Sequence, residues 1–266
     1  MKKVFTGVMV LLLASSAWAT SLSAHDIMVK NEAAGKLANV TSHAKMTTGG
    51  GDSKERVKEF TWWRKLQPDG IHFFTLTRFH FPPEVKGEGI LFLEHVQDQT
   101  DVELYLPTFK KIRRVESAQQ SGSFMGSEFS YSDIAAPHAD DFNYKLATEE
   151  DCGGLNHGVR CWVIESTPAT DGVKERTGSS KVRSWIRQDN FMAARAEYAA
   201  ADGNPWKKLE ASSIQEMDSQ NHKWMALDIR MENVKNNHFT SLHFDQVKVK
   251  TPVADSIFSL QNLAKE

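Results

Sequence analysis

The chain has 266 residues, of which 40% are hydrophobic and 25% are charged, and its formal net charge at pH 7 is −2. This balance argues against a nucleic-acid-binding protein, because such proteins carry clustered excess positive charge. The length is sufficient for one domain with a substantial apolar core.

Residues 1–19 contain the parts of a secretory signal peptide in the expected order. Two lysines are followed by apolar residues 4–13 and by an Ala-Trp-Ala cleavage site that ends at Ala19. A membrane-spanning helix would need about 20 consecutive apolar residues, and no cysteine lies near the cut to carry a lipid anchor. We therefore expect cleavage after Ala19, export to a bacterial periplasm and one domain over residues 20–266.

A helix is expected at each end of the mature chain. Residues 25–40 lack proline and place Ile27 and Leu37 near helical spacing, and a glycine-rich turn follows at residues 49–51. Residues 254–264 follow a proline and carry apolar residues at helical intervals, so they predict a closing helix.

Between these helices, segments rich in β-branched and aromatic residues recur between turn signals. This pattern predicts a meander of about eleven antiparallel strands. The candidate segments are residues 56–66, 71–81, 88–97, 101–106, 110–116, 142–149, 159–167, 181–188, 191–201, 206–217, 222–233 and 238–251.

The strands differ in how their apolar residues are distributed. Val102, Leu104 and Leu106 share one side of a strand that is polar on the other side, whereas residues 91–93 are apolar on both sides. A sheet with a strongly apolar face must close into a barrel, pack helices over that face or bind something apolar.

The chain contains only two cysteines, Cys152 and Cys161, which flank a glycine-rich turn. In an oxidising compartment this arrangement predicts a disulfide across the mouth of a hairpin or loop. The alternative is a pair of metal ligands, but two further ligands at zinc-like spacing are missing from the sequence.

Motifs for catalysis or metal binding are weak. None of the ten histidines occurs in an H-E-x-x-H pattern, and the best local cluster is His138 with Asp140 and Asp141 in an expected loop. Residues 122–127 resemble a hydrolase elbow, but Phe124 occupies the position where that motif needs a serine. We therefore predict a non-enzymatic protein without a metal or other cofactor.

A basic run, Lys110-Lys111-Ile112-Arg113-Arg114, falls on one of the predicted strands. Such a run is most often a solvated strand face. The alternative is a surface that attracts an acidic lipid headgroup or an acidic patch on a partner.

Several motifs in this sequence resemble those of LolA-like outer-membrane lipoprotein-sorting proteins. The most distinctive block consists of Leu104-Tyr105-Leu106-Pro107, Lys111-Ile112-Arg113-Arg114 and Ser123-Phe124-Met125-Gly126-Ser127-Glu128-Phe129-Ser130-Tyr131-Ser132-Asp133-Ile134. Further pieces fit the family's order on both sides of this block, with Pro82-Pro83 before it and Cys161-Trp162, Lys207-Lys208-Leu209 and Met231-Glu232-Asn233 after it. The resemblance covers nearly the whole mature chain.

The resemblance implies a mainly β fold, an unclosed half-barrel made of one strongly curved antiparallel sheet with N- and C-terminal helices covering it. It also implies a monomeric carrier that holds lipid or lipoprotein acyl chains in a concave apolar cavity. Its partners would be an inner-membrane exporter of the resistance-nodulation-division (RND) type or an outer-membrane acceptor. The branch that the motifs resemble is often described alongside such exporters, whereas LolA itself is a dedicated lipoprotein shuttle. Likeness in fold therefore does not identify the cargo.

Two groups of candidate site residues follow from the strand pattern and this resemblance. The candidates for lipid-lining residues lie on the apolar side of their strands, and they are Phe73, Phe79, Phe92, Leu104, Met192, Leu227, Ile229 and Met231. The candidates for a lid or a partner-docking loop are Phe124, Met125, Phe129, Tyr131 and Asp133. The alternatives are plain core under the helices for the first group and a loop that plugs the barrel mouth for the second.

Two other functions remain open at this point. The chain could be an accessory protein that docks on an RND-type exporter without carrying lipid, with its concave face filled by its own side chains. It could also be an enzyme that acts on envelope lipids or glycans, although no catalytic motif in the sequence supports that interpretation.

Overall fold

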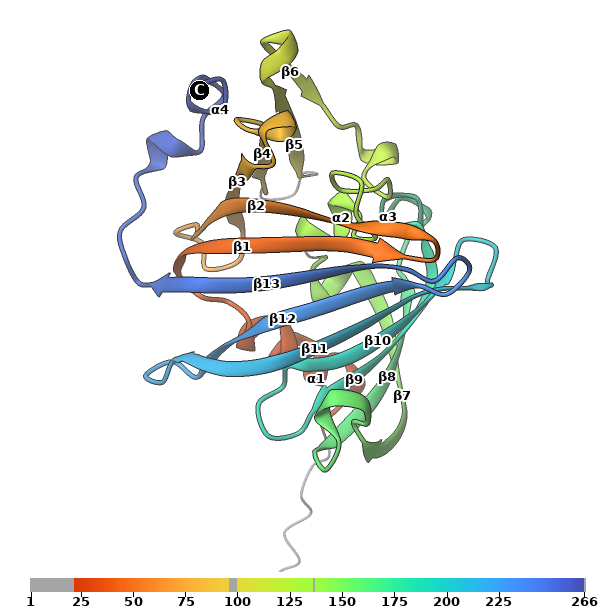
Figure 1. Ribbon diagram of the computed structural model, residues 1–266. Helices are drawn as coiled ribbons and strands as arrows, with labels where there is room; N and C mark the ends of the chain where they lie inside the picture. Colours follow the sequence, from red (N-terminus) through yellow and green to blue (C-terminus); the bar gives the residue numbers. More distant parts are fainter. Residues whose placement is uncertain (1–21, 96–99, 136, 266) are drawn as a thin grey trace, which may run out of the picture.

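A computed structural model describes residues 22–95, 100–135 and 137–265. The expected signal peptide and its cleavage site after Ala19 lie outside these residues. A single antiparallel sheet of 13 strands forms the body of the protein (Figure 1). Within the described part of the chain, no helix is both long and apolar enough to cross a membrane.

The sheet consists of β1 Asn39–Gly50, β2 Ser53–Leu66, β3 Phe73–Phe81, β4 Gly89–Leu93, β5 Asp101–Leu106, β6 Lys111–Arg114, β7 Phe142–Asp151, β8 Arg160–Pro168, β9 Ser179–Arg187, β10 Ala193–Ala200, β11 Pro205–Asp218, β12 Lys223–Asn233 and β13 His238–Val249. The helices are α1 Ala24–Ala34, α2 Tyr131–Ala135, α3 Asp171–Thr177 and α4 Leu260–Leu263. Short 3₁₀ turns lie in several of the connections.

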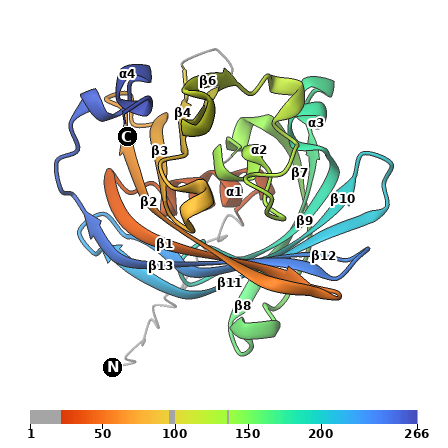
Figure 2. The same cartoon turned by 45° about the horizontal axis from the view of Figure 1, so that its top comes forward.

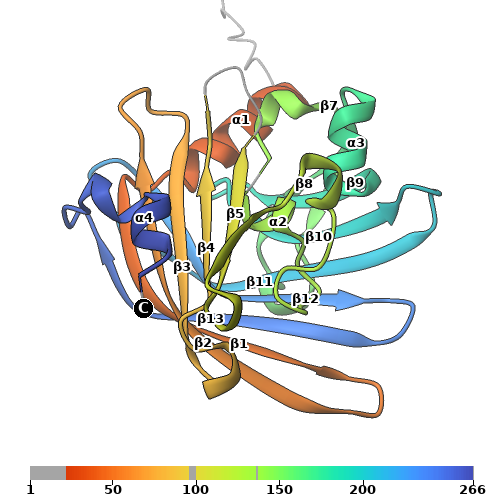
Figure 3. The same ribbon diagram turned by 90° about the horizontal axis from the view of Figure 1, so that it is seen from above.

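The strand order shows how the sheet is wound. It runs β6-β5-β4-β3-β2-β1-β13-β12-β11-β10-β9-β8-β7, so two meanders meet where β1 pairs with β13. The free edges are therefore β6 and β7, which are consecutive in the chain. Residues 115–141, which include α2, must cross from one edge of the open sheet to the other, and Figure 3 shows this connection in front of the strands.

The sheet curves strongly, and α1 lies inside the curve (Figure 2). Ser23 caps α1, since its hydroxyl accepts the Asp26 N–H while the Asp26 carboxylate accepts the Ser23 N–H. The buried Ile27 of this helix packs against Ile164 and Ile186 on the inward side of β8 and β9. The N-terminal helix thus covers part of the concave face, as the resemblance implies.

The C-terminal segment covers the other face. Phe258 and Leu263 pack against Leu76, Leu91 and Tyr105, which point outward from β3, β4 and β5. This second, smaller core explains why these strands are apolar on both sides: their inward residues join the main core and their outward residues meet the C-terminal segment. The predicted closing helix at residues 254–264 is split into a 3₁₀ turn, Asp255–Ile257, and the short α4.

The predicted fold class is confirmed, with one strand missed. Each predicted strand range overlaps one of β2 to β13, although the range 88–97 extends into residues outside the described part. The missed strand is β1, because the helix prediction extended to residue 40 and residues 49–51 were assigned to a flexible turn. The helix ends at Ala34, before Gly35, and Val40, Ala44 and Met46 then alternate into the core as strand residues.

The predicted disulfide is also confirmed. Cys152 and Cys161 are bonded, with a sequence separation of 9, and they link the end of β7 to β8. Both are fully buried on the outer side of the sheet, beside Val163 and Trp185. The Asp151 carboxylate accepts the backbone N–H groups of Gly153 and Gly158, which organises the turn between the two cysteines.

Candidate functional site: a cavity inside the curved sheet

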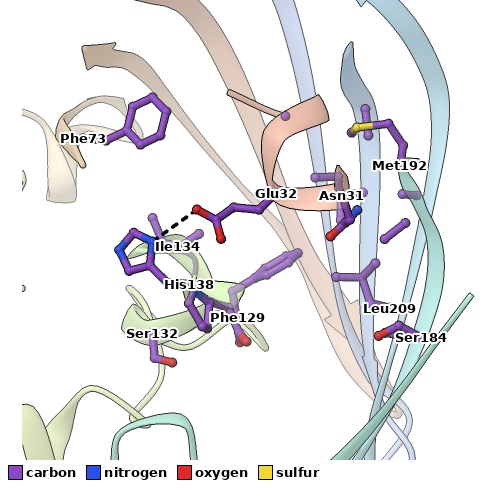
Figure 4. Close-up of a pocket in the computed structure, with 18 of the residues that line it drawn as sticks. Asn31, Glu32, Phe73, Phe129, Ser132, Ile134, His138, Ser184, Met192 and Leu209 are labelled. Carbon is purple, nitrogen blue, oxygen red and sulfur yellow. Dashed lines mark hydrogen bonds and ion pairs between the residues drawn. The ribbon is translucent and has the colours of Figure 1, made fainter. Parts of the chain in front are cut away.

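A cavity of about 520 Å³ lies on the concave side of the sheet, between α1, the end of the crossing connection and the strands. Figure 4 shows side chains from these different elements pointing into it, including Asn31 from α1, Phe129 from the connection and Met192 beside β10. Its size falls within the range of small-molecule sites, which measure roughly 300 to 1,000 Å³.

One wall of the cavity is aromatic. Phe60 and Trp62 from β2, Phe73 from β3 and Phe244 from β13 line it, and the rings of Trp62 and Phe244 lie 5.5 Å apart. These residues occupy inward positions because β2 and β13 both flank β1 in register, with Ala44 paired to Phe60 on one side and to Phe244 on the other. The small Ala44 between them leaves room for the rings.

The opposite wall is made of small side chains. Ser166, Ser184, Ala193, Ala196 and Ala211 line it from β8 to β11. A register shift between Ala193 and Arg195 keeps Ala193 and Ala196 of β10 inward, with Ala193 opposite Ile186 and Ala196 opposite Ser184. Because these side chains are short, they do not fill the space that the curvature of the sheet encloses, and the cavity results.

The crossing connection fills one end of the barrel. We call residues 120–135 the plug. Its Phe124 and Phe129 are almost completely buried, and the Phe124 ring lies 6.3 Å from that of Phe79 and 6.4 Å from that of Phe92. Backbone hydrogen bonds from Phe124 N–H to the Phe129 carbonyl and from Tyr131 N–H to the Gly122 carbonyl hold the plug in a closed loop.

Several polar contacts fasten the plug to the sheet, and two of them involve buried groups of the strands. The Lys207 ammonium, whose residue is 2% exposed, lies 2.9 Å from the Asp133 carboxylate. The backbone N–H of Glu128 donates to the buried Thr240 hydroxyl at 2.8 Å. Asp133 also accepts the Ser130 N–H at the start of α2, so one carboxylate both caps the helix and neutralises a buried lysine.

The cavity reaches solvent at Ile71, a lining residue that is 47% exposed. We call Ile71 and the ionisable lining residues Glu32, Lys36 and His138 the mouth. The Glu32 carboxylate lies 2.6 Å from Lys36 Nζ and 3.4 Å from His138 Nδ1, and it accepts the Ala139 N–H at 2.7 Å. Figure 4 shows Glu32 reaching from α1 towards the His138 ring. These contacts join α1 to the end of the crossing connection.

Contacts within the mouth shift the pKa values of Glu32 and His138. Burial of Glu32 acts to raise its pKa, but hydrogen bonds from His138, Lys36 and the Ala139 N–H outweigh that effect and lower it to about 2. The hydrogen bond to Glu32 raises the pKa of His138, against the opposing effect of burial. The pair is therefore held as carboxylate and imidazolium more strongly than either group would be in water.

Two further ionisable residues, Arg64 and Glu94, lie near the mouth. Arg64, on the inward side of β2, lines the cavity with its guanidinium carbon 3.7 Å from the centre of the Phe73 ring. Glu94, which is 5% exposed, accepts the Phe73 N–H at 2.8 Å, and its other close neighbour is His138 Nε2 at 3.8 Å. Burial raises the pKa of Glu94.

The eight predicted lining residues divide into two sets. Phe73, Met192 and Ile229 line the cavity. The others belong to the apolar core around it: Phe79, Phe92 and Met231 are completely or almost completely buried, whereas Leu104 and Leu227 pack against that core while partly exposed.

The five predicted loop residues all lie in or beside the plug. Phe124, Phe129 and Asp133 line the cavity, and Met125 and Tyr131 pack against the main core. The Lys58 ammonium donates to the Met125 carbonyl. In this conformation the loop closes one end of the barrel.

The small wall and the charged mouth were missed by sequence reasoning. A search for large apolar residues passes over Ser184 and Ala196, although both occupy inward positions of their strands. Arg64 lies on the inward side of β2 together with Phe60 and Trp62. The alternation of side chains along a strand could have predicted this position from the sequence. Glu32 carried no signal, since its partner His138 lies more than 100 positions away.

The other sequence motifs lie outside the cavity or serve local structure. Lys110, Lys111, Arg113 and Arg114 are exposed on and beside the edge strand β6. Of the acids near His138, Asp141 pairs with Arg176 and Asp140 lies 3.3 Å from His25. Across the residues whose positions are described, His, Cys, Asp and Glu side chains form no group of three that could hold a metal ion.

Comparison with known proteins places this architecture in a family. A protein-family model with the description "uncharacterized protein" matches residues 74–265. The chain belongs to this family. No curated protein matches the sequence.

Solved structures show the same fold. The chain is similar to a DUF1329 family protein from Desulfovibrio piger, with 25% identity, a TM-score of 0.82 and coverage of 90% of this chain and 97% of that one. It is also similar to a structure described as an outer membrane lipoprotein-sorting protein domain from Vibrio parahaemolyticus, with 21% identity, a TM-score of 0.81 and coverage of 91% and 98%. A LolA superfamily protein from Nitrosomonas europaea gives 18% identity, a TM-score of 0.69 and coverage of 91% and 100%. The protein therefore has a LolA-like fold.

Proposed function

We propose that this protein is an exported, non-enzymatic carrier that holds lipid or lipoprotein acyl chains in its concave cavity. The observation that carries the proposal is the cavity of about 520 Å³, which has an aromatic wall and opens to solvent at Ile71. Similarity in fold to a solved structure that is described as an outer membrane lipoprotein-sorting protein domain supports it. In this proposal residues 1–19 are the signal peptide and residues 20–266 form the carrier domain in the periplasm.

The physical need for such a carrier is large. Each methylene removed from water stabilises the bound state by roughly 0.8 kcal/mol, so an acyl chain of about 14 methylenes costs on the order of 10 kcal/mol to leave exposed. A protein that covers the chain lowers this cost while cargo crosses water. Cargo would pass to or from a membrane partner, either an RND-type exporter or an outer-membrane acceptor.

Filling the cavity tests this proposal directly. Ala196 is 5% exposed and points into the cavity from β10, so Ala196→Phe puts a ring where the acyl chain would lie. We expect at least a ten-fold loss of affinity for a fluorescent fatty acid, measured by titration. Ala201→Phe, at an exposed site in the turn after β10, is the matched control and should bind as the parent protein does.

The result is decisive in either direction when folding is checked by circular dichroism. Unchanged affinity in a folded Ala196→Phe variant would remove the cavity from consideration. The absence of saturable binding by the parent protein would contradict the carrier function itself.

One feature favours a second function, docking on a membrane transporter. The exposed edge strand β6 carries Lys111 and Arg113, and Phe109 beside it is 67% exposed. Basic residues on an edge also prevent unwanted strand pairing, so the proposal needs a test. The double change Lys111→Glu and Arg113→Glu should abolish co-purification with a cross-linked exporter if β6 is the docking surface. Capture at the parental level would exclude it.

A further inference from the structure

Arg64 is a charged side chain that β2 places within the aromatic wall. It faces inward, paired with Val40 of β1 and Thr75 of β3, and it lines the cavity together with Trp62 and Phe73. Its guanidinium stacks on the Phe73 ring at 3.7 Å and lies 5.9 Å from the Trp62 ring. The aromatic faces fix the position of the cation but do not use its N–H groups.

Those N–H groups have no partner within the described chain. Among residues 22–95, 100–135 and 137–265, no hydrogen bond or ion pair is formed by the Arg64 side chain. A guanidinium carries five N–H donors and stays protonated in proteins. Arg64 is only partly buried, and its nitrogens are not among the fully buried polar atoms that lack a partner, so water in the open cavity can reach them. Desolvation of the side chain lowers the pKa of Arg64 from its usual value.

The two nearby carboxylates are engaged elsewhere. Glu32 is bound by Lys36, His138 and the Ala139 N–H. Glu94 accepts the Phe73 N–H and lies near His138, and its burial favours the neutral acid. Neither carboxylate therefore bonds to the Arg64 guanidinium, which lines the cavity.

We propose that the cavity selects amphiphiles with an anionic head, whose carboxylate or phosphate oxygens bind the Arg64 guanidinium while the acyl chain lies along the aromatic wall. This inference rests on the proposed carrier function and narrows its cargo. A guanidinium matches the geometry of carboxylate and phosphate oxygens, which accept two of its N–H groups at once. An ester- or amide-linked acyl chain without a charged head makes no such pair.

The orientation of the cargo follows from the position of the charges. The mouth residues and Arg64 lie on the side of the cavity where Ile71 is exposed. The small wall of Ser184 and Ala196 and the plug residues Phe124 and Phe129 supply the rest of the lining. The head would thus stay close to water, and the chain would extend towards the plug.

The test compares lipids that differ only in the head. Palmitate is paired with hexadecanol, and 1-palmitoyl-lysophosphatidic acid with 1-monopalmitoylglycerol, in displacement titrations at pH 8, where both anionic heads are ionised. The parent protein should bind at least one anionic member ten-fold or more tightly than its neutral counterpart. The pair with the larger ratio identifies carboxylate or phosphate as the preferred head.

Variants assign that preference to Arg64. In Arg64→Gln the two members of each pair should bind equally, with hexadecanol affinity within about three-fold of the parent value. Arg64→Lys, which keeps the charge without the fork of N–H groups, should retain part of the preference. Arg56→Gln, at an exposed position of the same strand, should behave as the parent protein.

The outcomes separate this inference from the proposed function. Equal binding of anionic and neutral lipids by the parent protein would overturn the inference and leave the carrier function standing. A preference that survives in folded Arg64→Gln would also overturn it. If the parent protein binds none of the four lipids, the carrier function fails and this inference fails with it.

Discussion

At the scale of single residues, the pair of Lys207 and Asp133 determines how firmly the plug is held. Removing one partner of a buried ion pair leaves an uncompensated charge, whereas removing both does not. Asp133→Asn keeps an acceptor for the Ser130 N–H and so isolates the effect of the charge. We expect it to lower the free energy of unfolding by about 3 kcal/mol, measured by urea denaturation.

The matched control for that prediction is the double variant Asp133→Asn and Lys207→Met. Without a buried charge, it should be more stable than Asp133→Asn alone. A double variant that is less stable than the single one would show that the plug is held mainly by its apolar contacts.

A second prediction at this scale concerns pH. The pKa of His138 is raised in the folded protein. Its contact with Glu32 therefore stabilises the fold at pH values below the unfolded-state pKa of about 6.5, and this stabilisation is lost as pH rises through the folded-state pKa. The pKa of Glu32 is lowered to about 2, so its contribution is present above about 4.3 and is lost as pH falls towards 2.

The mouth should therefore loosen as His138 is deprotonated. Hydrogen exchange of the α1 amides, corrected for the intrinsic effect of pH, should accelerate as pH rises through the His138 pKa measured by NMR. His138→Gln should remove this step. Protection of α1 that is independent of pH in the parent protein would contradict the role given to this contact.

At the scale of elements, the sequence predicted most strands but not how the two ends of the chain pair in the sheet. Alternation and turn signals located β2 to β13, since those signals are local in the chain. The strand β1 was missed because a helical pattern ends at Ala34 only five residues before Asn39, where β1 begins. Its pairing with β13 joins residues about 200 positions apart, and no local pattern encodes such a contact.

The disulfide belongs to this scale because it joins β7 to β8. In the chain-entropy account, a bond that closes a loop of this size contributes roughly 2 to 3 kcal/mol. We expect Cys152→Ala with Cys161→Ala to lower the free energy of unfolding by that amount in urea, while fatty-acid affinity is kept because the bond lies on the outer face of the sheet. A loss of affinity in the folded variant would show that the hairpin affects the cavity.

At the scale of the whole molecule, the cavity exists because the sheet curves without closing. Large inward residues on β2, β3 and β13 fill one side, and small ones from β8 to β11 leave the other side empty. The sequence predicted an apolar concave face, but most of the large residues selected for it are core. Phe79, Phe92 and Met231 are examples of such core residues. Large side chains fill the space inside the sheet, so the cavity lies where the inward residues are small.

The central claim is that this cavity holds acyl chains. The most direct measurement is native mass spectrometry of the protein purified from cells without detergent, compared with Ala196→Phe purified in the same way. The account predicts an added mass equal to that of one or more lipids on the parent protein, with that mass reduced or missing in the variant. A parent protein that carries no lipid and takes up none when incubated with palmitate would contradict it.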